Sequence, residues 1–331
     1  MKLRGSRPAG SMTERRIDGI SQDTRQVLPG KLRLNPADKV AIAYLLFIAF
    51  LIAIFSVRIK WWVLLHVGHA IAIAVVVLVA GWEQSVIGSG ASSSRKRLAR
   101  FIRGWYPVLL IPITYKELSY LIPLIHPHDF DAALAAIDHR FLGVHPTVWL
   151  ERFTWPLLTE VLQLIYSSYY FLPIILGIVL WRSRRFEEFH FWVFIVLLGF
   201  YLSYLGYIAV PVIGPRFLPE IVQAQTKPLT GVWLFQPVRE MLDRAEGITR
   251  DCFPSGHTEL TLLVLYYSHR FHRKTFYWLL PIGTGIIIST VYLRYHYVID
   301  VLAGAIFAFA ILMMAKPLYR ALGANAAAES R

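Results

Sequence analysis

Long apolar runs separated by short polar segments dominate the pattern of this chain. The runs cover approximately residues 40–57, 62–81, 105–125, 158–181, 189–212, 257–271, 275–293 and 297–316. Most of them approach the roughly 20 residues that a helix needs to cross the hydrocarbon core of a bilayer, and the run from 257 is the short one. The pattern predicts an all-α integral membrane protein with about eight transmembrane helices.

Composition supports the membrane class and narrows the chemistry. Of the 331 residues, 56% are hydrophobic, and the mean hydropathy is +0.50. A soluble domain of this length has no place to bury so much apolar surface. The only cysteine, Cys252, excludes an intramolecular disulfide framework and a cysteine-rich metal site. The first 39 residues are polar and basic, without the apolar core of a cleavable signal peptide.

The basic residues gather in alternate polar segments. These segments are 2–39, 95–103, 182–185, 270–274 and 316–320, whereas the intervening loops carry several acids. Eight alternating helices place all five segments on one side, which the positive-inside rule makes the cytoplasm. We therefore attribute the net charge of +13 to membrane topology and expect no nucleic-acid partner. Both termini are expected in the cytoplasm and the loop 213–256 outside, in a multi-pass protein of a bacterial inner membrane.

A helix-breaking turn stands where the sixth apolar run begins. The stretch from Cys252 to Leu260 reads CFPSGHTEL. Ser255 suits an N-cap, and Gly256 leaves room for a ligand to approach the backbone. The N-terminus of the helix that starts near His257 favours an anion through its free N–H groups and its dipole. Alone, the turn is only slightly more typical of a catalytic site than of an ordinary helix start.

The predicted topology brings a second polar cluster to the same membrane face. A helix running inward from His257 and a second helix returning to Leu293 place RYHYVID, residues 294–300, on the outer side. His296 and Asp300 are four positions apart, so they share a face of a helix. A carboxylate at this spacing can fix the imidazole tautomer and leave the other nitrogen as a nucleophile. In isolation, such a pair is more often a structural contact.

Two arginines complete the predicted anion site. Arg216 lies just past the fifth run and Arg294 lies two residues before His296. Arginine suits the forked hydrogen bonding of phosphate, although Arg216 could instead be an interfacial anchor. Together with Ser255 and Gly256, these residues predict phosphoryl transfer through a phosphohistidine at His296, with His257 as general acid. The chemistry requires no metal and no cofactor.

These residues resemble the motifs of the type 2 phosphatidic acid phosphatase superfamily of membrane lipid phosphatases and phosphotransferases. Pro254, Ser255, Gly256 and His257 match its second motif in full, and His296 and Asp300 match the third. The resemblance implies that His296 is the nucleophile, Asp300 its orienting acid and His257 the leaving-group acid. It also implies a six-helix catalytic bundle, which maps onto the last six predicted helices.

The chain departs from the usual motifs at three positions. Thr290 stands where the third motif has arginine, Ala209 where the first has lysine, and the first motif's Arg-Pro is inverted to Pro215–Arg216. Such motifs are similar to the branch that contains inositol phosphorylceramide synthases. That resemblance implies a phosphorylated lipid as substrate and a lipid alcohol as a candidate acceptor.

The resulting plan divides the chain into four parts. We expect a basic cytoplasmic segment at 1–39, two additional helices with a basic loop at 40–104, the catalytic membrane domain at 105–317 and a cytoplasmic tail at 318–331. Three functions remain open: hydrolysis of a lipid phosphate, transfer of a phospho-head group to an alcohol, and non-catalytic transport or binding on the same fold.

Further polar groups fall within or beside the predicted spans. Lys116 and Glu117 lie midway along the third run, where we expect them to pair with each other or with another helix. The cluster YSSYY, residues 166–170, could bind a head group or pack helices together. The segment 127–155 predicts an interfacial helix on the outer surface.

Overall fold

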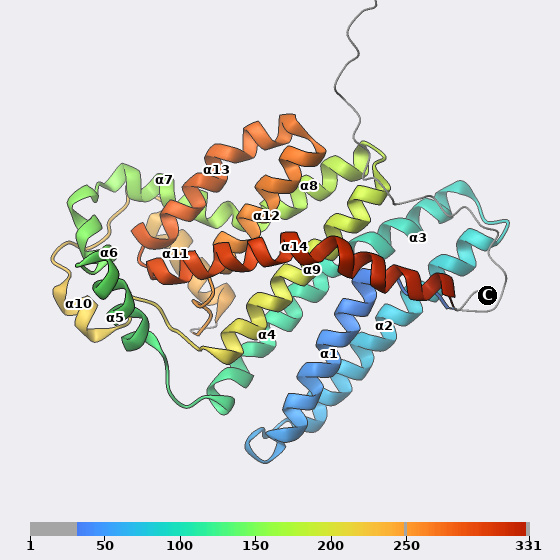
Figure 1. Ribbon diagram of the computed structural model, residues 1–331, viewed down its shortest axis with the longest axis horizontal. Coiled ribbons are helices and arrows are strands. Elements are labelled where there is room, and N and C mark those ends of the chain that lie inside the picture. The colour runs from blue at the N-terminus through green and yellow to red at the C-terminus, as the bar shows by residue number, and fades with distance from the viewer. Residues whose placement is uncertain (1–31, 248–249, 329–331) are drawn as a thin grey trace, which may run out of the picture. The chain divides into compact units, whose positions relative to one another are not determined.

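The structure is a computed structural model that describes residues 32–247 and 250–328, with side chains up to residue 323. Every regular element in these ranges is a helix (Figure 1), and 3₁₀ turns cover Ser56–Arg58, Leu150–Phe153 and Ser168–Tyr170. The α-helices are α1 Pro36–Ile54, α2 Trp62–Gly88, α3 Ser93–Trp105, α4 Pro107–Ile125, α5 Asp131–Leu142, α6 Pro146–Trp149, α7 Pro156–Ser167, α8 Phe171–Arg182, α9 Phe186–Ala209, α10 Pro219–Ala224, α11 Phe235–Glu246, α12 Gly256–Phe271, α13 Arg273–Tyr292 and α14 Val298–Ala328. The predicted all-α membrane class is confirmed.

Seven of the described helical segments are long and apolar enough to cross a membrane. They are α1, α2, the joined α3–α4, the joined α7–α8, α9, α13 and α14. The eighth predicted span forms as α12, which has 16 residues and is shorter than the others. A helix of this length rises about 24 Å, less than a hydrocarbon core of roughly 30 Å.

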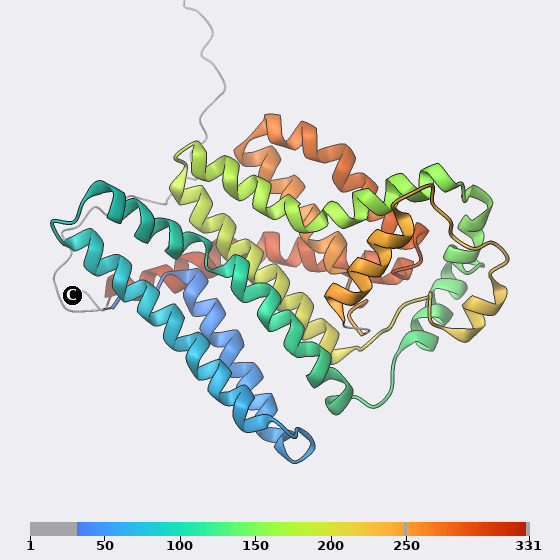
Figure 2. The ribbon, with the colours of Figure 1, turned by 180° about the vertical axis from the view of Figure 1, so that it is seen from behind.

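Helices α9 and α12 form the centre of the bundle. Helix α12 packs against α13, α14, α9 and α8, while α9 also contacts α1, α4 and α8. Figure 2 shows α4 and α8 diverging along their lengths, with α9 passing between them. Large side chains such as Trp192, Phe191 and Phe194 fill the surface of α9 and are fully buried. Helix α12 begins directly after the Pro-Ser-Gly-His turn, so this turn is anchored at the centre of the bundle.

The two N-terminal helices pack directly on the rest of the bundle. Tyr44 of α1 stacks on Tyr201 of α9 at 4.0 Å between ring centres. Buried Asp38, at the start of α1, forms an ion pair with Arg103 of α3. The predicted pairing of Glu117 is with His69 of α2, at 3.1 Å. The stacked pair Tyr44–Tyr201 and the ion pair His69–Glu117 both cross the predicted boundary at residue 104.

Basic residues from separate segments collect at one end of the bundle. Arg97 and Arg100 of α3 and Arg182 and Arg184 of the α8–α9 turn line one surface hollow. Arg185 donates to the carbonyl of Phe271, which ties this turn to the α12–α13 turn. We call this the basic end.

The ends of the chain differ from the predicted plan. Most of the predicted segment 1–39 lies outside the described residues, and α1 begins four residues earlier than the predicted boundary. The predicted tail 318–331 is helical as far as Ala328, because α14 continues through Pro317. The segment 127–155 contains α5, α6 and a 3₁₀ turn rather than one helix.

Candidate active site

The Pro-Ser-Gly-His turn caps α12 and packs on α14. The Ser255 hydroxyl accepts a hydrogen bond from the Thr258 N–H at 3.3 Å, as expected of an N-cap. The Ser255 N–H donates to the carbonyl oxygen of Asp300 at 3.0 Å. A Cβ on Gly256 would collide with the hydroxyl of Tyr207, so only glycine fits this first helical position. The turn is therefore held against the segment that carries the second histidine.

His296 and Asp300 meet, but not on one helix as predicted. Helix α14 begins at Val298, so His296 lies in the turn before it. The Asp300 carboxylate folds back over the helix start, where it accepts the Tyr297 N–H at 2.8 Å. Its Oδ2 lies 3.4 Å from Nδ1 of His296. Both side chains are buried, at 4% and 0% exposure, so this carboxylate is the group placed to orient the ring.

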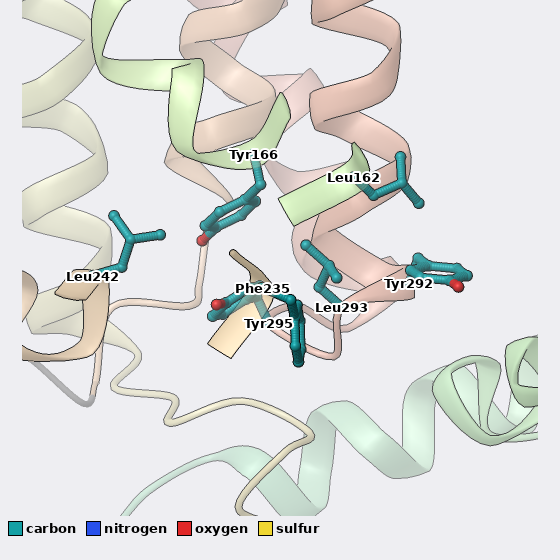
Figure 3. Packing of buried hydrophobic residues seen from close by; sticks show 7 residues of the cluster. All are labelled: Leu162, Tyr166, Phe235, Leu242, Tyr292, Leu293 and Tyr295. Atoms are coloured by element: carbon teal, nitrogen blue, oxygen red, sulfur yellow. The ribbon is translucent and has the colours of Figure 1, made fainter. Parts of the chain in front are cut away.

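The predicted pair of histidines converges. The rings of His257 and His296 lie 5.7 Å apart between centres. Tyr166 stacks on His257 at 4.3 Å, and Tyr169 packs against the same ring at 4.1 Å. Tyr166 also stacks on Tyr295 at 4.3 Å, within the buried cluster drawn in Figure 3. Residues of the YSSYY cluster thus position His257 by ring contacts.

Arg216 reaches the same region from a loop that is fixed by Asp131. The Asp131 carboxylate accepts the N–H groups of Ile213 and Gly214 at 2.8 and 2.7 Å. Gly214 has a φ of 109°, and a side chain there would collide with the carbonyl of Tyr295. The Arg216 guanidinium lies over the Tyr295 ring at 4.6 Å and pairs with Asp243 of α11 at 2.9 Å.

Of the four residues predicted to bind phosphate, Arg216 lines the cavity described next, whereas Ser255, Gly256 and Arg294 do not. Arg294 makes contacts elsewhere. Its φ of 66° turns the backbone into the left-handed region. The guanidinium donates to Glu151 at 3.0 Å, to Gln225 at 2.7 Å and to the carbonyl of Lys227 at 2.6 Å. These contacts tie Arg294 to the loop before α11, and the residue does not line the cavity described next.

A cavity of about 320 Å³ extends from the two histidines into the bundle. Its polar end is lined by His257, His296 and Arg216 together with Glu246 and Asp251. Its apolar part lies between α4, α8 and α9. The apolar lining includes Trp105, Val108, Ile111, Ile174, Phe189, Trp192, Val193, Val196 and Phe200. This combination suits a ligand with an anionic head and a hydrocarbon chain.

The two acids of the polar end were not predicted as site residues. Tyr170 donates to Glu246 at 2.6 Å, and Tyr115 donates to Asp251. Burial, together with the neighbouring charge of Asp251, raises the pKa of Glu246 to about 7. Burial also raises the pKa of Asp251. The only sequence signal was the position of Asp251 directly before the cysteine of the motif turn.

One group of side chains at the site has the donor types of a metal ligand set. The thiol of Cys252, an imidazole nitrogen of His296 and a carboxylate oxygen of Asp300 all lie within 4.8 Å of one another. The thiol also donates to the carbonyl oxygens of Ile213 and Tyr295, at 3.1 and 3.2 Å. A metal ion bound here would occupy the histidine nitrogen that faces Asp300.

Comparison with known proteins agrees with this geometry. A family model of the PAP2 superfamily matches residues 132–314, and the chain belongs to this superfamily. The match includes both histidines, Asp300 and Arg216. Searches of curated proteins and of solved structures returned no match. Membership supports a phosphatase-type phosphoryl-transfer function on a phosphorylated lipid in a membrane.

Proposed function

We propose that this protein is a membrane-embedded phosphoryl-transfer enzyme in which His296 forms a phosphohistidine. The imidazole Nε2 attacks phosphorus, the bond to the leaving alkoxide breaks, and His257 gives that oxygen its proton. In the second half-reaction, an acceptor hydroxyl attacks phosphorus, the bond from phosphorus to Nε2 of His296 breaks, and the proton of the hydroxyl passes to His257. Asp300 holds Nδ1 of His296 protonated, so that Nε2 keeps its lone pair.

One observation favours this proposal over non-catalytic roles such as transport or binding. Two histidines 39 positions apart in the chain meet at 5.7 Å, at the polar end of a cavity whose remaining walls are mostly apolar. A structural role for either histidine would not require an adjoining cavity. The apolar walls belong to helices long enough to span a membrane, so a hydrocarbon chain of a lipid suits them.

The location of the site supports catalysis at the non-cytoplasmic face. The basic end comprises α3, the α8–α9 turn and the α12–α13 turn, whereas His257 begins α12 at its other terminus. The positive-inside rule assigns the basic end to the cytoplasm. We infer that the phosphate is presented from the outer leaflet of a cell membrane.

Two acids beside the histidines provide a place for the acceptor hydroxyl. Glu246 and Asp251 line the cavity together with both histidines, and Tyr170 and Tyr115 donate to them. A carboxylate can accept a hydrogen bond from the hydroxyl group of a lipid alcohol or from water. The inositolphosphotransferase-like reaction and hydrolysis are therefore the two outcomes that product analysis separates.

The proposal is tested by following two products at once. The purified protein in detergent is given a panel of lipid phosphates and phosphodiester lipids, with and without a lipid alcohol. Inorganic phosphate and new phospholipids are measured together, with His296→Ala as the blank. A His296-dependent lipid product indicates transfer, and His296-dependent phosphate release indicates hydrolysis. Equal turnover in His296→Ala and the native protein would instead favour a non-catalytic role in transport or binding.

Activity is expected to survive removal of divalent metal ions. His296, His257 and arginine supply the nucleophile, the proton and the positive charge, so the proposed steps assign no role to a metal. The measurement is initial rate after dialysis against EDTA, followed by addition of Mg²⁺, Mn²⁺ or Zn²⁺. Loss of activity in EDTA that a divalent ion restores would overturn this prediction. Such a result would direct attention to Cys252, His296 and Asp300 as ligands.

Substrate binding is expected to weaken as the pH rises through about 7. Below this pH Glu246 is protonated and neutral, and above it a carboxylate faces the phosphate in the same cavity. Repulsion of about 1 kcal/mol corresponds to a roughly fivefold rise in KM. Glu246→Gln should remove this rise. Glu240→Gln, on the exposed side of the same helix, should retain it, and identical pH profiles for all three proteins would refute the assignment.

A further inference from the structure

Arg239 is a half-buried arginine of α11 for which the described residues provide no acceptor. Its guanidinium lies 5.5 Å from the centre of the Tyr295 ring and 5.6 Å from that of Phe235. Both contacts are cation–π contacts. Neither neutralises its charge or satisfies its five N–H donors. A guanidinium withdrawn from water in this way is stable only when an anion or several acceptors compensate it.

A second cation beside Arg239 makes its uncompensated positive charge still less favourable. Arg216 lies over the same Tyr295 ring, at 4.6 Å. Burial lowers the pKa of Arg239 and the nearby charge of Arg216 adds to this effect, while Tyr295 and the more distant charge of Asp243 oppose it only in part. Because Tyr166 stacks on one face of Tyr295, the two guanidiniums are left with the other face. Two cations therefore crowd one aromatic surface next to His296.

The other arginines at this end of the bundle are already supplied with acceptors. Arg294 donates to Glu151, Gln225 and the carbonyl of Lys227. Arg216 pairs with Asp243, whose side chain is 40% exposed. An exposed acid of this kind contributes little and can exchange for another anion at small cost. An incoming anion would therefore gain the most favourable binding free energy between Arg216 and Arg239.

Helix α11 presents Arg239 rigidly rather than on a loose loop. The Glu160 carboxylate of α7 accepts the N–H groups of Val232, Trp233, Leu234 and Phe235 at the start of the helix. At the other end, Lys116 of α4 donates to the carbonyls of Ala245 and Glu246 at 2.8 and 3.0 Å. Phe235 and Leu242 also belong to the buried cluster of Figure 3.

We propose that the phosphate group of the substrate binds between Arg216 and Arg239, displacing Asp243 from Arg216. This inference rests on the proposed function and adds a phosphate-binding residue from outside the sequence motifs. Arg216 and Tyr295 line the cavity together with His296, and Arg239 lies outside this lining, against the Tyr295 ring. Unlike Arg294, Arg239 has no acceptor among the described residues, so its guanidinium can turn to a bound anion. Two guanidiniums can hold two non-bridging oxygens of the phosphate while His296 approaches phosphorus.

The test begins with inorganic phosphate, which binds without turnover. Isothermal titration in detergent compares the native protein with Arg239→Gln, Arg239→Lys and Arg244→Gln. Arg244 belongs to the same helix, is 78% exposed and pairs with Glu240, so it is a matched control. Arg239→Gln should weaken phosphate binding at least tenfold. Arg239→Lys, which keeps the positive charge, should recover most of it, and Arg244→Gln should change nothing.

Turnover of a lipid phosphate supplies the second readout. Arg239→Gln should raise KM at least tenfold with a smaller change in kcat, and Asp243→Asn should lower KM. Equal phosphate affinity and equal KM in Arg239→Gln and Arg244→Gln would overturn the proposal. The titration is repeated in His296→Ala, where Arg239 should still govern phosphate binding. Retained turnover in that variant would refute the proposed function without deciding the role of Arg239.

Discussion

Replacing Asp300 by Asn is expected to lower kcat/KM by about 10³- to 10⁴-fold while the fold persists. One oxygen of Asp300, Oδ2, accepts the Tyr297 N–H at 2.8 Å and also lies 3.4 Å from Nδ1 of His296. If the asparagine places its amide nitrogen here, it donates to Nδ1, the ring proton moves to Nε2, and the nitrogen that should attack phosphorus loses its lone pair. If it places its oxygen here, it keeps the Tyr297 N–H but no longer offers a negative charge to the imidazole ring as positive charge develops on it.

The measurement is steady-state turnover of a lipid phosphate, with circular dichroism and size-exclusion chromatography as controls for folding. Asp138→Asn is the matched control because Asp138 accepts the N–H groups of Val298 and Ile299 at the start of the same helix. That variant disturbs α14 without touching the tautomer of His296. Comparable losses in the two variants would mean that Asp300 acts through helix position alone, and near-normal turnover of Asp300→Asn would remove its assigned role.

Replacing His257 by Ala is expected to cost about 10²- to 10⁴-fold with a lipid phosphate, the usual contribution of a general acid. An alkoxide leaves poorly without a proton, and His257 is the imidazole beside the nucleophile, at 5.7 Å between ring centres. A phosphate ester of an acidic phenol needs no such proton. His257 is also the proposed base of the second half-reaction, so the comparison uses the first half-reaction alone. In a single turnover the variant should release phenol from an aryl phosphate within roughly tenfold of the native rate.

The dependence on the leaving group separates acid catalysis from structural damage. Tyr166→Phe keeps the ring that stacks on His257 at 4.3 Å and should affect both substrates little. Equal losses of His257→Ala in the single-turnover rates on the alkyl and aryl substrates would contradict a role in protonating the leaving group. Such a result would assign His257 to packing between Tyr166 and Tyr169 instead.

The membrane helices could be predicted because their physical cause is local. A bilayer requires about 20 apolar residues and internally satisfied backbone groups, and both conditions can be read from a single run. The same reasoning identified the run after His257 as short, and α12 has 16 residues. Helix α11 could not be predicted in this way. Its ends are fixed by Glu160 and Lys116, which are more than 70 positions distant in the sequence.

The part of the site that depends on a single helical hairpin could be predicted from the sequence. That hairpin brings His257 and His296 to one end of the bundle. Neighbours in sequence were a poorer guide. Arg294 was expected at the phosphate because it precedes His296 by two positions, yet its φ of 66° directs it towards Glu151. Glu246 and Asp251 are held at the site by hydrogen bonds from Tyr170 and Tyr115. Because these partners are distant in the sequence, no local pattern predicts the contacts.

Formation of a phosphohistidine at His296 is the central claim, and trapping it is the most direct test. The purified protein is mixed with a ³²P-labelled lipid phosphate and quenched in alkali within a single turnover. We predict labelled protein whose phosphate is stable to base and labile to acid, with the label on His296 and absent from His296→Ala. Product formed at the native rate without labelled protein, or label that persists in His296→Ala, would contradict the account.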